Sequence, residues 1–168
     1  LEYSSKWPKF IIIHSTSELQ LNSGDLNYDT PKPQISSLQK VVYQLTNSTE
    51  LPYNFILERI NNDYQIIVCR PILTYAPYAD MNETYLKSIH IGVLGDLNKQ
   101  QVNSRLYSVL AHRLVCPLMR LFNIHTDKIV LHNQISNNPE CDCPGENFNI
   151  EKFRTIIHAH LKFISVSR

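Results

Sequence analysis

The chain has 168 residues, of which 43% are hydrophobic and 18% are charged, and its formal net charge is +1. These values are ordinary for a globular protein, and we expect residues 1–168 to form a single domain with a substantial core. A near-neutral charge without a basic stripe argues against nucleic acid as a partner. The longest apolar run, residues 10–13, is far shorter than the roughly 20 residues that cross a bilayer, so no membrane span is expected.

The first predicted elements are a strand, a loop and a helix. Residues 10–13 are apolar and mostly β-branched, which is typical of a fully buried strand, and polar side chains begin abruptly at His14. Residues 18–34 are rich in Asn, Ser, Asp and Pro and are predicted to be a loop. Apolar residues at positions 35, 38, 41, 42 and 45 then have helical spacing, which predicts a helix over 35–45.

A hairpin is predicted in the middle of the chain. Residues 53–59 alternate, so that Tyr53, Phe55 and Leu57 are expected on one side of a strand. The Asn-Asn-Asp turn at 61–63 leads into a partner strand over 64–69. Residues 71–85 contain two prolines and several tyrosines, which indicates a long loop of the kind that often borders a functional site.

The second half of the chain alternates strands with helices. A buried strand is expected over 88–94, followed by the strongest helical pattern, over 100–122, in which Pro117 predicts a kink or a break. A short strand over 129–131 ends at His132, a loop follows over 133–145, and a last helix covers about 150–161. We therefore predict an α/β fold with a mixed central sheet of about five or six strands and helices on both faces.

Two histidines and one cysteine form a candidate zinc site. His14 and His132 each follow a buried strand, and the carboxyl ends of parallel strands are where sites form in open α/β sheets. Cys143 follows His132 by 11 residues. Two neutral imidazoles and a thiolate suit a catalytic zinc ion, which keeps its fourth position for a water molecule and polarises a carbonyl group. With seven histidines and four cysteines in the chain, residue type alone also allows other combinations.

The order and context of these residues resemble a known family, the zinc N-acetylmuramoyl-L-alanine amidases, which includes bacteriophage lysozyme-amidases and animal peptidoglycan recognition proteins. The resemblance covers about residues 9–157 and is carried by segments in family order: IIIHST at 11–16, PYNFIL at 52–57, SIHIGV at 88–93, and IVLH at 129–132 followed by CPG at 143–145 and Phe148.

The resemblance implies a function and a set of site residues. It implies that His14, His132 and Cys143 bind Zn²⁺, and that Tyr53 points toward the metal, where its hydroxyl orients the water or stabilises the oxyanion. On residue type alone, Tyr53 would be interpreted as a half-buried tyrosine of a strand. The implied reaction is hydrolysis of the amide between N-acetylmuramic acid and L-alanine, with peptidoglycan or a muropeptide as partner. The substrate places the protein in the periplasm or outside the cell, or in the cytoplasm if it recycles wall fragments.

The sequence departs from the family pattern around the expected site. The basic residue that often stands two positions before the last ligand is Cys141, and the glutamate of the central strand is Gly92. The usual glycine of that strand is His90, and the pair after the second histidine is Asn133-Gln134. Three functions follow as alternatives: an amidase that depends on zinc and Tyr53, a peptidoglycan-binding module that retains zinc with little or no turnover, or a small hydrolase that acts on a different amide.

Two of these departures allow several roles. Cys141 can replace Cys143 as the ligand, form a disulfide or remain a thiol, and the Pro-Gly directly after Cys143 favours Cys143 as the ligand. His90 is interpreted either as an ordinary buried histidine or, if it faces the site, as a replacement acid/base or a group that supports a ligand.

Overall fold

The computed structural model describes residues 7–19, 38–39, 43, 50–75 and 82–166. Its centre is a five-stranded sheet with the strand order β3-β2-β4-β1-β5. The strands are β1 (Phe10–Ser15), β2 (Phe55–Ile60), β3 (Asp63–Val68), β4 (Ser88–Val93) and β5 (Ile129–Leu131). The β2–β3 hairpin is antiparallel, and the pairs β2–β4, β4–β1 and β1–β5 are parallel. The predicted mixed α/β sheet is thereby confirmed.

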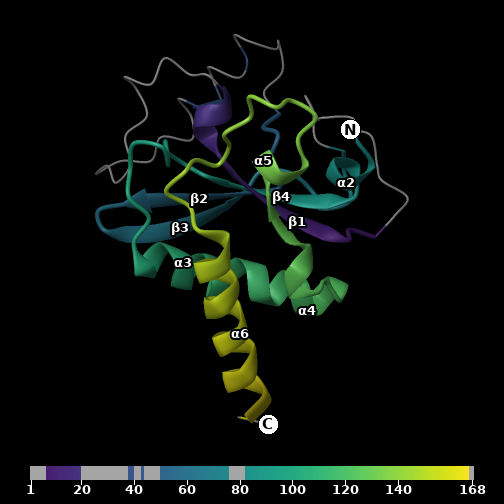
Figure 1. Ribbon diagram of the computed structural model, residues 1–168, viewed down its shortest axis with the longest axis vertical. Coiled ribbons are helices and arrows are strands. Elements are labelled where there is room, and N and C mark those ends of the chain that lie inside the picture. The colour runs from purple at the N-terminus through teal and green to yellow at the C-terminus, as the bar shows by residue number, and fades with distance from the viewer. Residues whose placement is uncertain (1–6, 20–37, 40–42, 44–49, 76–81, 167–168) are drawn as a thin grey trace.

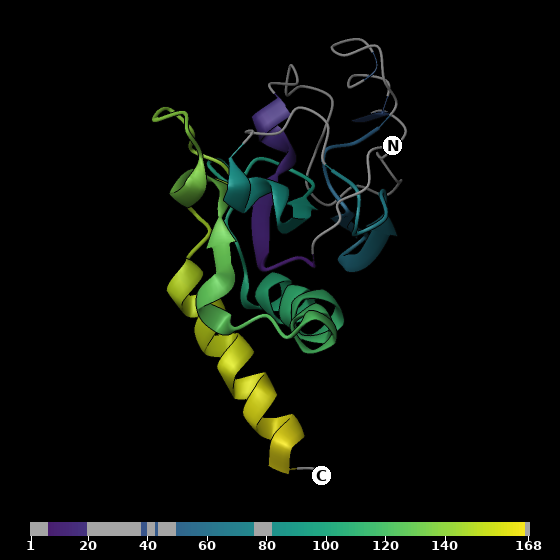
Figure 2. The same ribbon diagram turned by 90° about the vertical axis from the view of Figure 1, so that its right-hand side faces the viewer.

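Helices of very different length lie on the two sides of the sheet (Figures 1 and 2). One face is covered by α3 (Ser104–Leu110), the π-helix η2 (Ala111–Val115), α4 (Cys116–Phe122) and α6 (Ile150–Val166). The short helices η1 (Thr16–Leu19), α2 (Glu83–Leu86) and α5 (His132–Ile135) lie on the other side, and η3 (Thr126–Lys128) leads into β5. The long helices therefore leave one side of the sheet to short elements and loops.

Successive side chains of β1 point to opposite faces of the sheet, as in any β-strand. Ile11 and Ile13 belong to the main hydrophobic core beneath the long helices. Ile12 and His14 point the other way and are also fully buried. The neighbouring strand β4 repeats this division in register, with Ile12 opposite His90 and His14 opposite Gly92. The face opposite the main core thus carries His14 of β1 and His90 and Gly92 of β4.

The helical rod α3–η2–α4 packs on the core through leucines that are four residues apart. Leu106, Leu110, Leu114 and Leu118 are all buried. In a regular α-helix, residues that are four positions apart are offset by about 40° around the helix axis. The π-helix has more residues per turn, which compensates for this offset. The sequence predicted a kink or break at Pro117. The π-helix immediately before it is the observed irregularity, because Pro117 cannot donate a hydrogen bond to the preceding turn.

Several predicted loops contain short helices. The segment that begins at residue 18 starts within η1, and the one over 71–85 ends in α2, which is capped by the Asn82 side chain. The first residues of the loop predicted over 133–145 belong to α5, and α6 runs to Val166 rather than to about 161. Most of the helix predicted over 35–45 lies outside the described residues. Apolar periodicity does not detect single turns, because their formation depends on caps and tertiary contacts.

The predicted side for Tyr53 is wrong. β2 begins only at Phe55, and Tyr53 packs with Ile56 in a second hydrophobic cluster, whereas Leu57 belongs to the main core. The chain bends at Asn54, whose carbonyl accepts from the backbone N–H groups of both Cys69 and Arg70. This bend breaks the alternation and turns Tyr53 to the face that carries His14.

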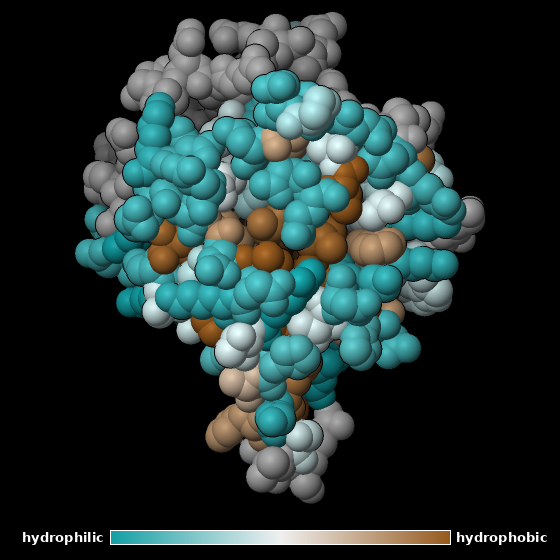
Figure 3. All heavy atoms as spheres, viewed as in Figure 1, coloured by the Kyte–Doolittle hydropathy of each residue, from teal (hydrophilic) through white to brown (hydrophobic). Residues whose placement is uncertain are grey.

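Helix α6 continues past the rest of the domain (Figures 1 and 2). Its far part carries Phe163, which is 73% exposed. Hydrophobic residues also reach the surface in the centre of the view in Figure 3, where hydrophilic residues surround them. Over the described stretches, every helix is too short or too polar to cross a bilayer.

Candidate metal centre

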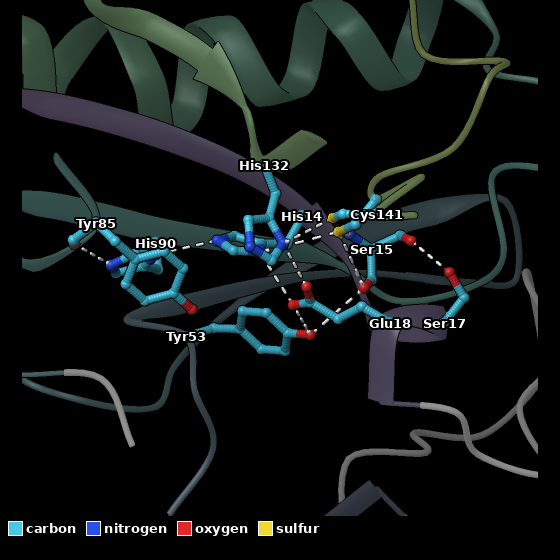
Figure 4. A network of polar contacts seen from close by, with 10 residues as sticks. His14, Ser15, Ser17, Glu18, Tyr53, Tyr85, His90, His132 and Cys141 are labelled. Atoms are coloured by element: carbon cyan, nitrogen blue, oxygen red, sulfur yellow. Dashed lines mark hydrogen bonds and ion pairs between the residues drawn. The ribbon is translucent and has the colours of Figure 1, made fainter. Parts of the chain in front are cut away.

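The two predicted histidine ligands meet at the carboxyl ends of β1 and β5. His14 is the fifth residue of β1, and His132 opens α5 directly after β5. Because these strands are parallel neighbours, both side chains project from the same edge. Their ring centroids are 4.6 Å apart, and the Nδ1 atoms of both rings approach one carboxylate (Figure 4).

The loop between α5 and α6 brings Cys143 to the same place. The Cys143 carbonyl accepts a hydrogen bond of 2.8 Å from Asn133 N, and Gly145, with φ of 125°, packs so closely that a Cβ would lie 2.5 Å from the Leu97 carbonyl carbon. Cys143 Sγ lies 3.9 Å from His14 Nδ1 and accepts from Ser15 N at 3.4 Å. The three predicted ligands are therefore neighbours in the fold.

Glu18 is the site residue that the sequence prediction missed. Its Oε1 lies 2.9 Å from His14 Nδ1, and its Oε2 lies 2.7 Å from His132 Nδ1. One ligand atom from each of His14, Glu18, His132 and Cys143 fits into a group whose members are all within 4.8 Å of one another. The 3₁₀ turn of η1 carries Glu18 back to the end of β1. The available signal was its spacing of four residues from His14, at the start of a segment interpreted as a loop.

Tyr53 also reaches this cluster. Its buried hydroxyl donates to Glu18 Oε1 at 2.7 Å and lies 3.4 Å from the Ser15 carbonyl oxygen (Figure 4). The ring lies over Gly92, where an added Cβ would meet ring carbons at 3.0 Å. Gly92 replaces the glutamate of the family pattern, and its lack of a side chain leaves the space that the Tyr53 ring occupies.

His90 faces the site as well. Its Nδ1 lies 3.0 Å from His14 Nε2, and its Nε2 lies 2.9 Å from the carbonyl oxygen of Tyr85. The ring is buried and packs against the Tyr85 ring at a centroid distance of 4.2 Å. His90 therefore contacts the ring nitrogen of His14 that faces away from Glu18.

The remaining departures from the family pattern lie around the cluster. Cys141 Sγ lies 3.7 Å from His132 Nδ1, on a partly exposed side chain. All four cysteines belong to the described residues, and none of them forms a disulfide there. Gln134 accepts from Leu131 N at 2.8 Å, and Asn133 holds the Cys143 loop, so this pair stabilises the backbone on which His132 stands.

Burial and charge set the protonation of these groups. Burial raises the pKa of Glu18, but the adjacent His14 and His132 outweigh it and hold the pKa well below its usual value. Burial, followed by the Glu18 charge, raises the pKa of both Cys143 and Tyr53 well above their ordinary values. Burial and His14 lower the pKa of His90 well below its ordinary value, which favours a neutral ring. Glu18 is therefore ionised, whereas burial favours the uncharged forms of Cys143, Tyr53 and His90.

The donor set fits a zinc ion. Imidazole, thiolate and carboxylate are the ligand types that zinc takes in proteins, and four of them within one small cluster match its tetrahedral preference. The carboxylate and a thiolate together would place two negative charges in a buried site, which requires a cation between them.

Comparison with solved structures defines the class of fold. The chain has the α/β fold of the N-acetylmuramoyl-L-alanine amidases and the peptidoglycan recognition proteins, as the sequence resemblance predicted. No protein-family model matches the sequence, and no significant match is found among curated proteins.

Three of these structures illustrate the similarity. The amidase LysC from Clostridium intestinale is 16% identical, with 94% of this chain and 93% of that chain covered and a TM-score of 0.64. AmpD is 17% identical, with coverages of 93% and 90% and a TM-score of 0.66. A variant of Drosophila PGRP-LB in complex with tracheal cytotoxin is 15% identical, with coverages of 89% and 82% and a TM-score of 0.64.

Proposed function

We propose that this chain is a zinc-dependent amidase that hydrolyses the bond between N-acetylmuramic acid and L-alanine in peptidoglycan. The observation that carries the proposal is the convergence of His14, Glu18, His132 and Cys143 at one sheet edge, beside the Tyr53 hydroxyl. Structures with the same fold include AmpD and the N-acetylmuramoyl-L-alanine amidase LysC from Clostridium intestinale. This similarity of fold supports the choice of substrate. Action on the cell wall further suggests a periplasmic or secreted protein.

The residues of the chain divide the chemistry among them. His14, His132 and Cys143 would hold the zinc ion, which supplies a Lewis acid for the scissile carbonyl and an acidic water molecule. His14 and His132 hold the pKa of Glu18 well below its usual value and so keep its carboxylate ionised, and an ionised carboxylate next to the ligands can act as the proton acceptor. Tyr53, which burial keeps protonated, can donate its hydroxyl hydrogen bond to the oxyanion that develops on the substrate.

One observation favours the alternative of a binding module with little turnover. Glu18 contacts both histidine Nδ1 atoms and belongs to the same group of four potential ligands. If its carboxylate binds the metal, the site has four protein ligands, as structural zinc sites do, and no position for water. The two functions therefore differ in whether Glu18 acts as a proton acceptor or as a fourth metal ligand that takes the position of water.

Incubation with peptidoglycan tests the proposal. We expect one equivalent of zinc in the purified protein, its loss in His14→Ala, and the release of new L-alanine amino termini without new sugar reducing ends. His125→Ala, in an exposed loop, is the matched control and should retain both properties. Binding of peptidoglycan without release would favour the inert module, and a native protein that binds no zinc would refute both versions.

A further inference from the structure

A chain of buried hydrogen bonds connects His14 to the backbone of α2. His14 Nε2 lies 3.0 Å from His90 Nδ1, and His90 Nε2 lies 2.9 Å from the carbonyl oxygen of Tyr85 (Figure 4). Both histidine rings are buried. These two hydrogen bonds therefore connect the metal centre to the carbonyl oxygen of Tyr85 without an intervening water molecule.

The chemistry of the last group sets the direction of every bond in the chain. A carbonyl oxygen can only accept, so His90 Nε2 carries the hydrogen that it donates to Tyr85. A neutral imidazole has one N–H, which leaves His90 Nδ1 as an acceptor. His14 Nε2 must then be the donor in the bond between the two rings. The remaining nitrogen of His14, Nδ1, is the one that faces Glu18 and Cys143.

We propose that His90 is a positioning residue that fixes the tautomer and the orientation of His14, so that the Nδ1 lone pair is presented to the metal. The inference rests on the proposed metal-dependent function and identifies a residue that supports a ligand. With Nε2 protonated, His14 Nδ1 can face the Glu18 carboxylate at 2.9 Å only if a second proton or a metal ion lies between them. With the hydrogen bonds in this direction, the contact between His14 Nδ1 and Glu18 requires a proton or a metal ion between the two atoms.

The fold holds His90 firmly enough for this task. Its backbone N–H donates to Asn54 Oδ1 at 2.8 Å, and its carbonyl accepts from Asn54 N at 2.8 Å. The Tyr85 ring packs against the His90 ring, and Tyr85 itself belongs to α2, which is capped by Asn82. Position 90 is paired in register with Ile12, two residues before His14 on the same face of β1. The acceptor atom is therefore placed by backbone pairing as well as by side-chain packing.

Two substitutions at position 90 separate the hydrogen bond from simple packing. His90→Phe keeps an aromatic ring but removes the acceptor, and we expect zinc affinity, measured by competition with a chromophoric chelator, to fall about 10- to 100-fold. His90→Asn places Oδ1 near the position of the former Nδ1 and should bind zinc within about threefold of the wild type. Equal losses in both variants, or no loss in His90→Phe, would overturn the proposal.

A measurement without metal tests the same bond directly. In ¹⁵N-labelled zinc-free protein, we expect a nitrogen–nitrogen coupling across the hydrogen bond from His14 Nε2–H to His90 Nδ1, and its loss in His90→Phe. A proton on His90 Nδ1 instead of on His14 Nε2 would overturn the assignment. If this coupling is present but the wild type binds no zinc, the proposed function fails and the positioning of His14 stands. If zinc binds and the coupling is absent, only the role of His90 fails.

Discussion

The ring of Tyr53 lies directly against the backbone of Gly92, where a side chain on residue 92 would have to stand. A Cβ there would be 3.0 Å from two ring carbons of Tyr53. This contact holds the ring over β4 while its hydroxyl reaches Glu18 at 2.7 Å. The missing side chain at position 92 and the position of the Tyr53 hydroxyl are therefore parts of one arrangement.

Gly92→Ala should displace the Tyr53 ring. The added methyl group overpacks a fully buried contact, and we expect the free energy of unfolding to fall by about 1–3 kcal/mol, as measured by urea denaturation. The displaced hydroxyl should also lower amide hydrolysis. In a Tyr53→Ala background the same substitution meets no ring, so its cost should largely disappear. If Gly92→Ala is equally destabilising in both backgrounds, the ring is not the cause.

Tyr53→Phe removes only the hydroxyl group. Because this group is placed to stabilise an oxyanion, we expect kcat for amide hydrolysis to fall by about 100-fold, while zinc content stays at the wild-type level. The ring still fills its place over Gly92, so stability should change little. Tyr64→Phe serves as the control, since Tyr64 packs in the main core away from the metal centre. Unchanged turnover in Tyr53→Phe would remove the hydroxyl from the mechanism.

Glu18→Gln and Glu18→Ala distinguish the two roles of this carboxylate. If Glu18 accepts a proton, both variants should keep zinc and lose about 100-fold or more in turnover. If Glu18 closes the metal site, zinc affinity should fall and the Ala variant should gain a position for water, with turnover equal to or above that of the wild type. Zinc titration and amino-terminus release, measured on the same samples, give the answer. Glu151→Gln on the exposed side of α6 is the matched control.

Zinc binding should release a proton from Cys143. Burial raises the pKa of this thiol well above its ordinary value, so the metal-free protein holds it protonated at neutral pH, whereas zinc binds the thiolate. Protons compete at low pH, and the affinity should therefore rise by about tenfold per pH unit for each proton released. Calorimetry in buffers with different heats of ionisation counts these protons.

The same measurement separates the two cysteines of the loop. Cys143→Ser should release one proton fewer and bind zinc weakly, whereas Cys141→Ser should behave as the wild type. The reverse pattern would assign the ligand role to Cys141, whose Sγ lies 3.7 Å from His132 Nδ1.

The sheet could be predicted from the sequence because its strands depend on local patterns. An unbroken apolar run identified β1, and a buried strand was expected over 88–94, where β4 lies. His14 and His132 were expected at one edge because parallel strands align their carboxyl ends. The structure brings His14 and His132 together at that edge. These placements need only the periodicity of strands and the direction of their pairing.

Other parts of the site depend on geometry that periodicity does not contain. Glu18 joins the cluster through a single 3₁₀ turn, and Tyr53 changes face because the chain bends at Asn54. The roles of His90 and Gly92 follow from contacts across strands, with His14 in one case and Tyr53 in the other. Such contacts between residues distant in the sequence become visible only once the strands are in register.

The alternation of β4 has a consequence for how this site can vary. Ile89, Ile91 and Val93 face the long helices, while His90 and Gly92 face the metal centre. Substitutions at the even positions therefore change the groups around the ligands, while the odd positions keep their contacts with the main core. Both departures from the amidase pattern in this strand fall on such positions. A protein built in this way can acquire new chemistry on one side of a strand while the main hydrophobic core on the other side is retained.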